Sequence, residues 1–271
     1  MTGVFDLFGM SGAKFETLLL MLVRISAMLS LVPVFSQNQV PRLVRFAIGI
    51  ILTIALARLV TPLPHTLSLG ELALAIAAQV FVGLVFGFVA FLLFTGFQFA
   101  GEIIDTQIGF AAVNIINPLT SASVTVIGEF QLALATLLYL TVDAHHALLG
   151  GMASSFRIVQ LPYVTAPDLV AGDIVKFFTQ ALFIVFEIAA PVAISLFLVN
   201  IALALTARVA PQLNLFVIGF PVQITVGLIM MIVSMPLLGA VFPSLVDQSV
   251  REQQTILRAM AGPTPSAVPV R

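Results

Sequence analysis

The sequence predicts an all-α integral membrane protein built from long, partly kinked helices arranged in hairpins. Of its 271 residues, 60% are hydrophobic and only 8% are charged, whereas soluble domains carry about a quarter charged residues. The mean hydropathy is +1.16. The apolar residues form continuous runs, which indicates helices, since a membrane β-barrel shows short alternating segments.

Six apolar regions qualify or nearly qualify as membrane helices. A helix needs ~20 apolar residues to cross the hydrocarbon, because its backbone polar groups must be satisfied within the segment. The third and fifth regions exceed this length, so we expect them to tilt, kink or extend outside the bilayer. The regions comprise residues 17–34, 43–60, 69–100, 124–142, 174–207 and 215–246.

Two features predict that these helices pack tightly against other protein. Pro191 in the fifth region and Pro221 and Pro236 in the sixth remove backbone donors, which is tolerated where protein or a cavity satisfies the freed carbonyls. Gly83 and Gly87 have the spacing of a close helix-packing pair. We therefore predict that this glycine pair contacts a neighbouring subunit.

The charges do not fit six ordinary alternating spans. Such spans would place basic residues on both sides of the membrane. The positive-inside rule requires an excess on one side, and that excess is missing. Either so few charges give a weak signal, or the helices are not simple alternating spans. The two groups are Arg42, Arg45 and Arg208, and Lys14, Arg157, Arg251 and Arg258.

Composition and motifs argue against several functional classes. A net charge of -1 offers no basic surface for nucleic acid. The absence of cysteine removes disulfides and thiolate metal sites, and the sequence has neither a GxSxG elbow nor a GxxxxGK[ST] loop. We expect neither enzymatic activity nor a cofactor.

The run VDAHHALL raises the question of a metal site or proton relay at Asp143, His145 and His146. Adjacent histidines point in different directions on a helix, and no third histidine or thiolate completes a ligand set. We favour a polar cluster at a helix end or membrane interface.

The stretch QIGFAAVNIINPLTS, residues 107–121, lies between two apolar regions and contains no charged residue. A solvated loop is usually more polar, and a helix in lipid would not normally carry Asn114, Asn117 and Pro118 so close together. The stretch therefore suits neither bulk water nor lipid.

A second interruption is RVAPQLNLFVIGFP, residues 208–221. Its polar and turn-forming residues, together with Gly219 and Pro221, predict a short turn followed by a break early in the next helix. A hairpin turn explains most of this pattern, and its polar side could equally contact a partner subunit. The residues assigned to that contact are Arg208, Pro211, Gln212 and Asn214.

Three stretches resemble the FliR family of flagellar type III export-gate proteins, which is related to the SctT family of virulence type III secretion. They are LVRISAMLSLVPVFSQNQVPRLVRFAIG (22–49), GEIIDTQIGFAAVNIINP (101–118) and RVAPQLNLFVIGFP (208–221). The third is the most specific, and the order of the three matches the family over nearly the whole chain.

The resemblance implies a role in a bacterial inner-membrane assembly of the flagellar basal body. One FliR-type chain would join five FliP-type and four FliQ-type subunits, with an FlhB-type protein as a further partner. The closed helical assembly would pass unfolded flagellar proteins across the membrane. Much of it would stand above the bilayer plane, so that its topology departs from alternating spans.

The resemblance also implies that the stretch after Gly109 plugs the channel. Many relatives have an acidic residue before the proline, where this chain has Asn117. Apolar side chains could still seal a pore by excluding water from its constriction. The residues assigned to the plug are Phe110, Ile115, Ile116, Asn117 and Pro118.

Two alternatives remain open from the sequence. One is a gate subunit of a virulence-type, non-flagellar type III system. The other is a small-molecule secondary transporter, for which Arg24 and Glu187 within apolar regions would be the evidence, although no convincing inverted repeat is present. We predict one helical domain over residues 1–261 and a flexible, Pro-rich tail over residues 262–271.

Overall fold

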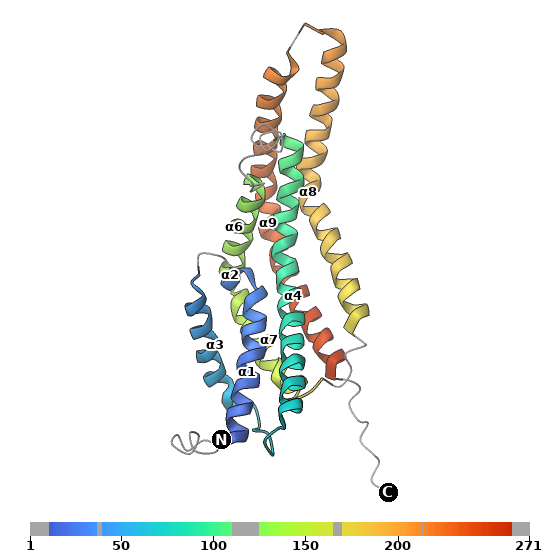
Figure 1. Ribbon diagram of the computed structural model, residues 1–271. Helices are drawn as coiled ribbons and strands as arrows, with labels where there is room; N and C mark the ends of the chain where they lie inside the picture. The colour runs from blue at the N-terminus through green and yellow to red at the C-terminus, as the bar shows by residue number, and fades with distance from the viewer. Residues whose placement is uncertain (1–10, 37–39, 110–124, 165–169, 213, 262–271) are drawn as a thin grey trace. The chain divides into compact units, whose positions relative to one another are not determined.

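The computed structural model describes residues 11–36, 40–109, 125–164, 170–212 and 214–261. Within these residues the chain is helical and contains no strand, which confirms the predicted fold class (Figure 1). The helices are α1 (Gly12–Leu31), α2 (Pro33–Ser36), α3 (Arg42–Leu56), the 3-10 helix η2 (Ala57–Leu59), α4 (Leu69–Ile108), α6 (Val126–Thr141), α7 (Ala144–Ile158), α8 (Val170–Val209) and α9 (Leu215–Ala261).

Three of the described helices are long and apolar enough to cross a membrane, namely α4, α8 and α9. The number rises to four if α6 and α7 count as one broken span. By the same criteria α1 does not qualify, because Lys14, Glu16 and Arg24 lie within its 20 residues, and α3 has only 15 residues. The membrane character is thus confirmed with fewer spans than the six regions considered.

The helix boundaries correct the sequence analysis in two places. Helix α9 is not broken at Gly219 and Pro221 but continues through them, and its last part extends past residue 246 to Ala261. Each proline removes only one backbone donor, and the helix continues on both sides of it. Helix α7 was not among the apolar regions, because its sequence, AHHALLGGMASSFRI, mixes polar with apolar residues.

Contacts along the chain define two compact units. Unit 1 comprises Met1–Leu92, Asp143–Phe177 and Asp247–Arg271, and unit 2 comprises Leu93–Val142 and Phe178–Val246. Three long helices, α4, α8 and α9, each contribute one part to each unit. The single domain over residues 1–261 stays a prediction, and the tail over residues 262–271 lies outside the described residues.

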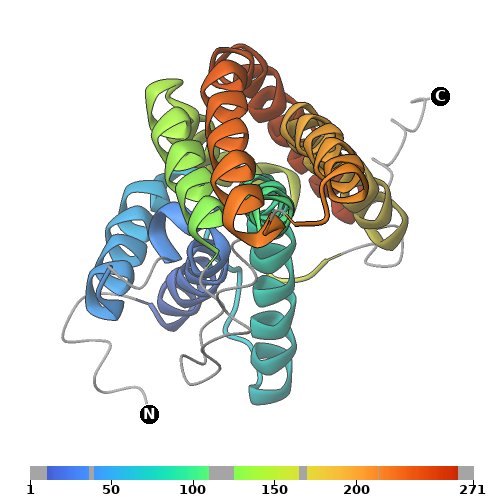
Figure 2. The same cartoon turned by 90° about the horizontal axis from the view of Figure 1, so that it is seen from above.

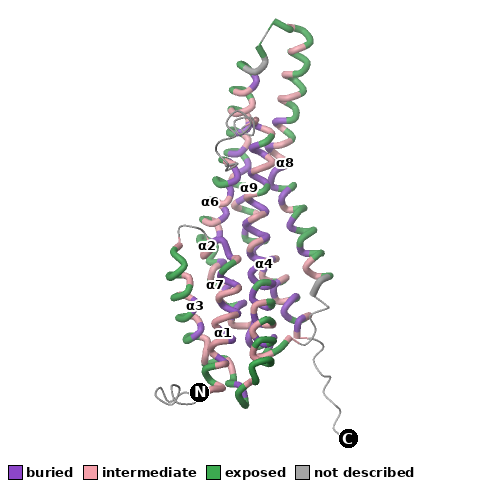
Figure 3. Tube along the Cα trace, viewed as in Figure 1, coloured by how far each residue is buried: buried purple, intermediate pink, exposed green. Residues whose placement is uncertain are grey.

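The core of unit 1 forms where α4 packs closely against α1, and Figure 3 shows the buried parts of both helices. A Cβ atom on Gly83 would lie 2.4 Å from the Arg24 carbonyl oxygen, and one on Gly87 would lie 2.8 Å from that of Met28. Helix backbones this close tolerate no side chain at the point of approach. The two glycines therefore set the separation of α1 and α4.

Arg24 of α1 is buried and joins three parts of unit 1. Its Nε donates to Oε1 of Gln79 at 2.7 Å, while Nη1 and Nη2 donate to the carbonyls of Ser155 and Val159, each at 2.9 Å. The guanidinium also lies 4.4 Å from the ring centroid of Phe156. Arg24 thus satisfies carbonyls at the C-terminal end of α7, where intrahelical donors run out.

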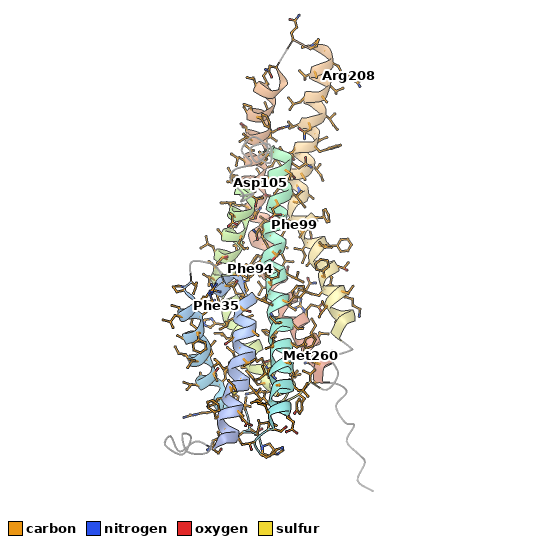
Figure 4. All side chains as sticks on the ribbon, in the orientation of Figure 1. Phe35, Phe94, Phe99, Asp105, Arg208 and Met260 are labelled. Atoms are coloured by element: carbon orange, nitrogen blue, oxygen red, sulfur yellow. The ribbon has the colours of Figure 1, made fainter. Side chains whose placement is uncertain are left out.

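Two aromatic contacts link helices in the core of unit 2. Phe94 of α4 lies 5.0 Å from Tyr139 of α6, measured between ring centroids, and Phe97 lies 5.3 Å from Phe242 of α9. Both separations are typical of favourable aromatic pairs. This part of α4 therefore holds α6 and α9 together, and Figure 4 labels Phe94 on it.

Candidate functional site

The charge-free stretch identified in the sequence connects α4 to α6. Residues 110–124 are outside the described part of the chain, so all five plug residues, Phe110, Ile115, Ile116, Asn117 and Pro118, fall there. The structure does describe the residues at which this segment leaves α4 and enters α6. Both ends belong to unit 2.

Asp105 ties the two ends of the segment together. It lies near the C-terminal end of α4 (Figure 4), and its side chain is buried. Both carboxylate oxygens accept from the backbone N–H of Ile127, at 3.3 Å. Thr125, at the N-cap position of α6, makes no side-chain capping bond, so Asp105 supplies the acceptor for the start of α6 from a different helix.

A close approach of backbones supports the same junction. A Cβ atom on Gly101 would lie 2.7 Å from the Cα atom of Gly128, and one on Gly128 would lie 3.2 Å from the carbonyl oxygen of Gln98. Only glycine allows α4 and α6 to come this near. Figure 2 shows the two helices side by side at this end.

Gly109 fixes the direction in which the chain leaves α4. Its φ of 94° is one that residues with side chains rarely adopt, and a Cβ atom there would lie 2.7 Å from Cε1 of Phe220. The preceding residue, Ile108, packs against Gly227 of α9. Conformation and space therefore both require glycine at this exit from the helix.

Helix α8 packs against α9 in the same unit. The Nε2 atom of Gln223 on α9 donates to Oδ1 of Asn200 on α8, and Leu203 lies against Gly219. Helices α4, α6, α8 and α9 thus all contribute to the region that carries the segment. The arrangement holds both ends of the uncharged segment.

The second predicted contact region is the connection between α8 and α9. Arg208, Pro211, Gln212 and Asn214 are all exposed, and Figure 4 shows Arg208 where the two helices are joined. The Asn214 carbonyl accepts from the N–H groups of Val217 and Ile218, at 3.0 and 3.3 Å, and so starts α9. Large apolar side chains are exposed beside these polar residues, with Val209 at 87% and Val217 at 66%.

The remaining predicted contact residues, Gly83 and Gly87, pack inside the chain. Both are buried against α1 of unit 1, as described above. The close-packing role that their spacing suggests is therefore performed within one subunit. Their contact with another subunit stays a prediction.

The histidine cluster begins α7. Asp143 has a left-handed φ of 55°, and one of its carboxylate oxygens lies 3.5 Å from Nδ1 of His146 and 4.0 Å from Nε2 of His145. The structure thus brings together three groups that could ligate a metal, with Asp143 and His146 exposed. The predicted role as a polar helix-end cluster matches this position at the start of α7.

Sequence reasoning missed Asp105 as the residue that organises the site. A signal was available, because a carboxylate near the end of a long apolar helix is costly and usually has a dedicated partner. What the sequence could not supply was the partner, since Ile127 lies beyond the charge-free stretch.

Similarity to known proteins decides the family. The family described as "Bacterial export proteins, family 1" matches residues 15–249. The chain belongs to this family. All three stretches that carry the resemblance, residues 22–49, 101–118 and 208–221, fall within the matched range of this bacterial export protein.

Curated relatives of this export protein carry flagellar names. The flagellar biosynthetic protein FliR of Bacillus subtilis (strain 168) is 34% identical over 247 residues, which cover 90% of this chain and 95% of the relative. FliR of Escherichia coli (strain K12) is 32% identical over 223 residues, 80% of this chain and 84% of the relative. The resemblance to the FliR family is thus confirmed.

A relative with a different name matches a shorter part of the export protein. The Yop proteins translocation protein T of Yersinia pestis is 30% identical over 166 residues, 60% of this chain and 63% of the relative. The relation to the virulence secretion family is therefore also confirmed.

Proposed function

We propose that this export protein is the FliR-type subunit of a flagellar type III export gate. One copy joins five FliP-type and four FliQ-type subunits in the bacterial inner membrane, within the flagellar basal body, and an FlhB-type protein is a further partner. The assembly passes unfolded flagellar proteins across the membrane. The chain contributes part of the channel wall and part of its seal, and it acts without a cofactor or catalytic residue.

The observation that carries the proposal is the anchoring of the charge-free segment at both ends. Asp105 and the Gly101–Gly128 contact hold its two ends together, and Gly109 sets its exit from α4. A seal must exclude water and ions at rest, yet move aside for a passing chain. Apolar residues such as Ile115 and Ile116 on a tethered segment meet both needs, because an apolar constriction expels water.

The exposed surface of α8 and α9 supports a role within an assembly. Their large apolar side chains are exposed on the isolated chain, and the connection between the helices adds Arg208 and Gln212. Apolar patches rimmed by polar residues are typical of protein and membrane contacts. We assign the connection, with Pro211 and Asn214, to contact with partner subunits.

Co-purification tests the proposal. The chain, affinity-tagged and co-expressed with FliP-type and FliQ-type proteins of the same bacterium, is expected to yield a complex that contains one copy of the chain by native mass spectrometry. Failure to recover either partner contradicts the proposed assembly.

The virulence-type alternative is supported by the match to the Yersinia protein. That match covers 60% of this chain, whereas the FliR protein of Bacillus subtilis covers 90%, so the flagellar system is favoured. Neighbouring genes for flagellar rod and hook proteins distinguish the two systems. Neighbouring genes for a virulence needle would reverse the choice.

A further inference from the structure

A groove between α1 and α3 of unit 1 has the chemistry of an anion site. Its volume is about 210 Å³, and it is lined by Ser26, Leu29 and Ser30 of α1 and by Arg42, Arg45 and Phe46 of α3. The two helices lie side by side in Figures 1 and 2. The lining residues contain two guanidinium groups and no carboxylate.

The two arginines lie at the end of α3 where the helix dipole makes a positive charge unfavourable. Arg42 and Arg45 are in the first turn of α3, which contains no acidic residue. The N-terminal end of a helix carries a partial positive charge, so cations there are unfavourable and a bound anion relieves the repulsion. Within the described residues Arg42 forms no salt bridge.

The hydrogen bonds already made within the groove determine which of its polar groups can donate to a ligand. Arg45 donates from Nε and Nη2 to the Val40 carbonyl, at 3.2 and 3.1 Å, which orients its guanidinium. The Ser30 hydroxyl donates to the Ala27 carbonyl at 2.6 Å. Ser26 therefore remains as the hydroxyl able to donate to a ligand, beside two guanidinium groups that suit phosphate oxygens.

The surface next to the groove indicates where such a phosphate comes from. Six large apolar side chains stay exposed along α3 (Figure 3), and the four most exposed are Leu43 at 79%, Ile54 at 65%, Ile51 at 64% and Phe46 at 52%. Phe46 lines the groove and also belongs to this face. In a membrane protein such a face suits acyl chains, which places hydrocarbon directly beside the anion site.

We propose that this groove binds the phosphate head group of an anionic phospholipid, whose acyl chains lie along the exposed face of α3. The volume is below the ~300 Å³ of small-molecule pockets, which suits a head group alone. Two cationic side chains favour a lipid with net negative charge over a zwitterionic one. The proposal stands independently of the export function.

Native mass spectrometry of the full-length chain in neutral detergent tests this site. The probes are phosphatidylglycerol, phosphatidylcholine with the same acyl chains, and glycerol 3-phosphate. We expect phosphatidylglycerol to bind at least tenfold more tightly than the other two. Arg42→Gln should weaken that binding severalfold and Arg42→Gln with Arg45→Gln more strongly, whereas Ser26→Ala should have a smaller effect.

The matched control is Arg58→Gln, because Arg58 is an exposed arginine of η2, just beyond the other end of α3. Equal weakening by Arg58→Gln would mean general charge attraction and overturn the site. Equal binding of phosphatidylcholine, or of glycerol 3-phosphate, would overturn the choice of an anionic lipid. Unchanged binding of phosphatidylglycerol to the Arg42→Gln, Arg45→Gln double variant would overturn the site.

Discussion

Asp105 illustrates how one side chain can organise a segment that lies between two helices. Its carboxylate is buried near the end of α4 and accepts from the backbone N–H of Ile127 at the start of α6. Since α6 lacks a side-chain cap of its own, the bond serves both helix capping and closure of the segment.

We therefore predict that Asp105→Ala loosens the start of α6. Losing a cap costs about 1 kcal/mol, which corresponds to roughly fivefold faster hydrogen exchange at the Ile127 amide. Exchange read by mass spectrometry on peptides covering residues 125–131 measures this. Asp105→Asn should behave nearly as the parent, because asparagine caps about as well.

The control for that experiment is Glu129→Gln, since Glu129 is an exposed acid in the same first turn of α6. It removes a charge near the same amides without removing the cap. If Asp105→Ala and Glu129→Gln accelerate exchange alike, charge near the helix end and not the hydrogen bond is responsible.

At the scale of elements, glycines decide how near the helices come. Gly83 and Gly87 bring α4 against α1, and Gly101 brings it against Gly128 of α6. In each case the missing Cβ would meet backbone atoms, which cannot rotate away. Helix spacing in both units is therefore fixed by small residues along α4.

Gly83→Ala is expected to destabilise the chain. Its Cβ would lie 2.4 Å from a backbone oxygen, and overpacking of this kind costs about 1–3 kcal/mol. Thermal unfolding in detergent, followed by circular dichroism, should show a lower midpoint. Gly150→Ala is the matched control, because a Cβ there meets nothing within 4 Å.

Gly150→Ala should leave the midpoint unchanged or raise it, since alanine is favoured over glycine in a helix by about 0.5–1 kcal/mol. A midpoint that falls equally in both variants would mean that helix packing at Gly83 is not the cause.

The segment between α4 and α6 gives a second prediction at this scale. Replacing Ile115 and Ile116 with glycine is expected to raise resting ion leakage severalfold through the assembled gate, because the constriction loses apolar surface. Ion efflux from proteoliposomes containing the complex measures it. The valine replacements keep the apolar surface and should stay ion-tight.

Recovery of intact complex is the control for leakage, since the glycine variant must still assemble. Leakage equal to that of the parent gate would show that another element forms the main seal.

At the scale of the whole molecule, much of the surface is suited to contacts beyond the chain. Exposed apolar side chains extend along α3, α8 and α9, as Figure 3 shows by burial. A membrane can cover some of this surface, and partner subunits the rest. Three candidate spans, together with α1 and α3, which do not qualify as spans, agree with an irregular topology.

The connection between α8 and α9 supplies a test of assembly. Arg208→Ala with Gln212→Ala is expected to reduce recovery of FliP-type and FliQ-type subunits severalfold, while the melting midpoint of the chain alone stays constant, because both residues are exposed. Arg157→Ala removes an exposed charge from α7 and should leave recovery intact. Unchanged recovery of the partner subunits with the double variant would mean that these residues only form the turn.

Hydropathy and spacing alone determined the helical membrane class, the long apolar helices, a turn between α8 and α9, and the close packing of Gly83 and Gly87, although not the partner that they pack against. These properties depend on residues near one another in the chain, so local pattern suffices. Family membership was predicted from three stretches because their amino-acid sequences and their order along the chain are specific. The continuation of α9 was missed, since its last part is polar and its prolines resemble breaks.

Only the tertiary structure decided which residues meet. Asp105 with Ile127, Arg24 with the end of α7, and the groove between α1 and α3 each join positions from separate elements. Hydrophobic pattern shows that a polar group in an apolar helix needs a partner, but it does not say which backbone group will be within reach. That choice follows from how the helices pack, and here glycines and buried aromatic rings set the packing.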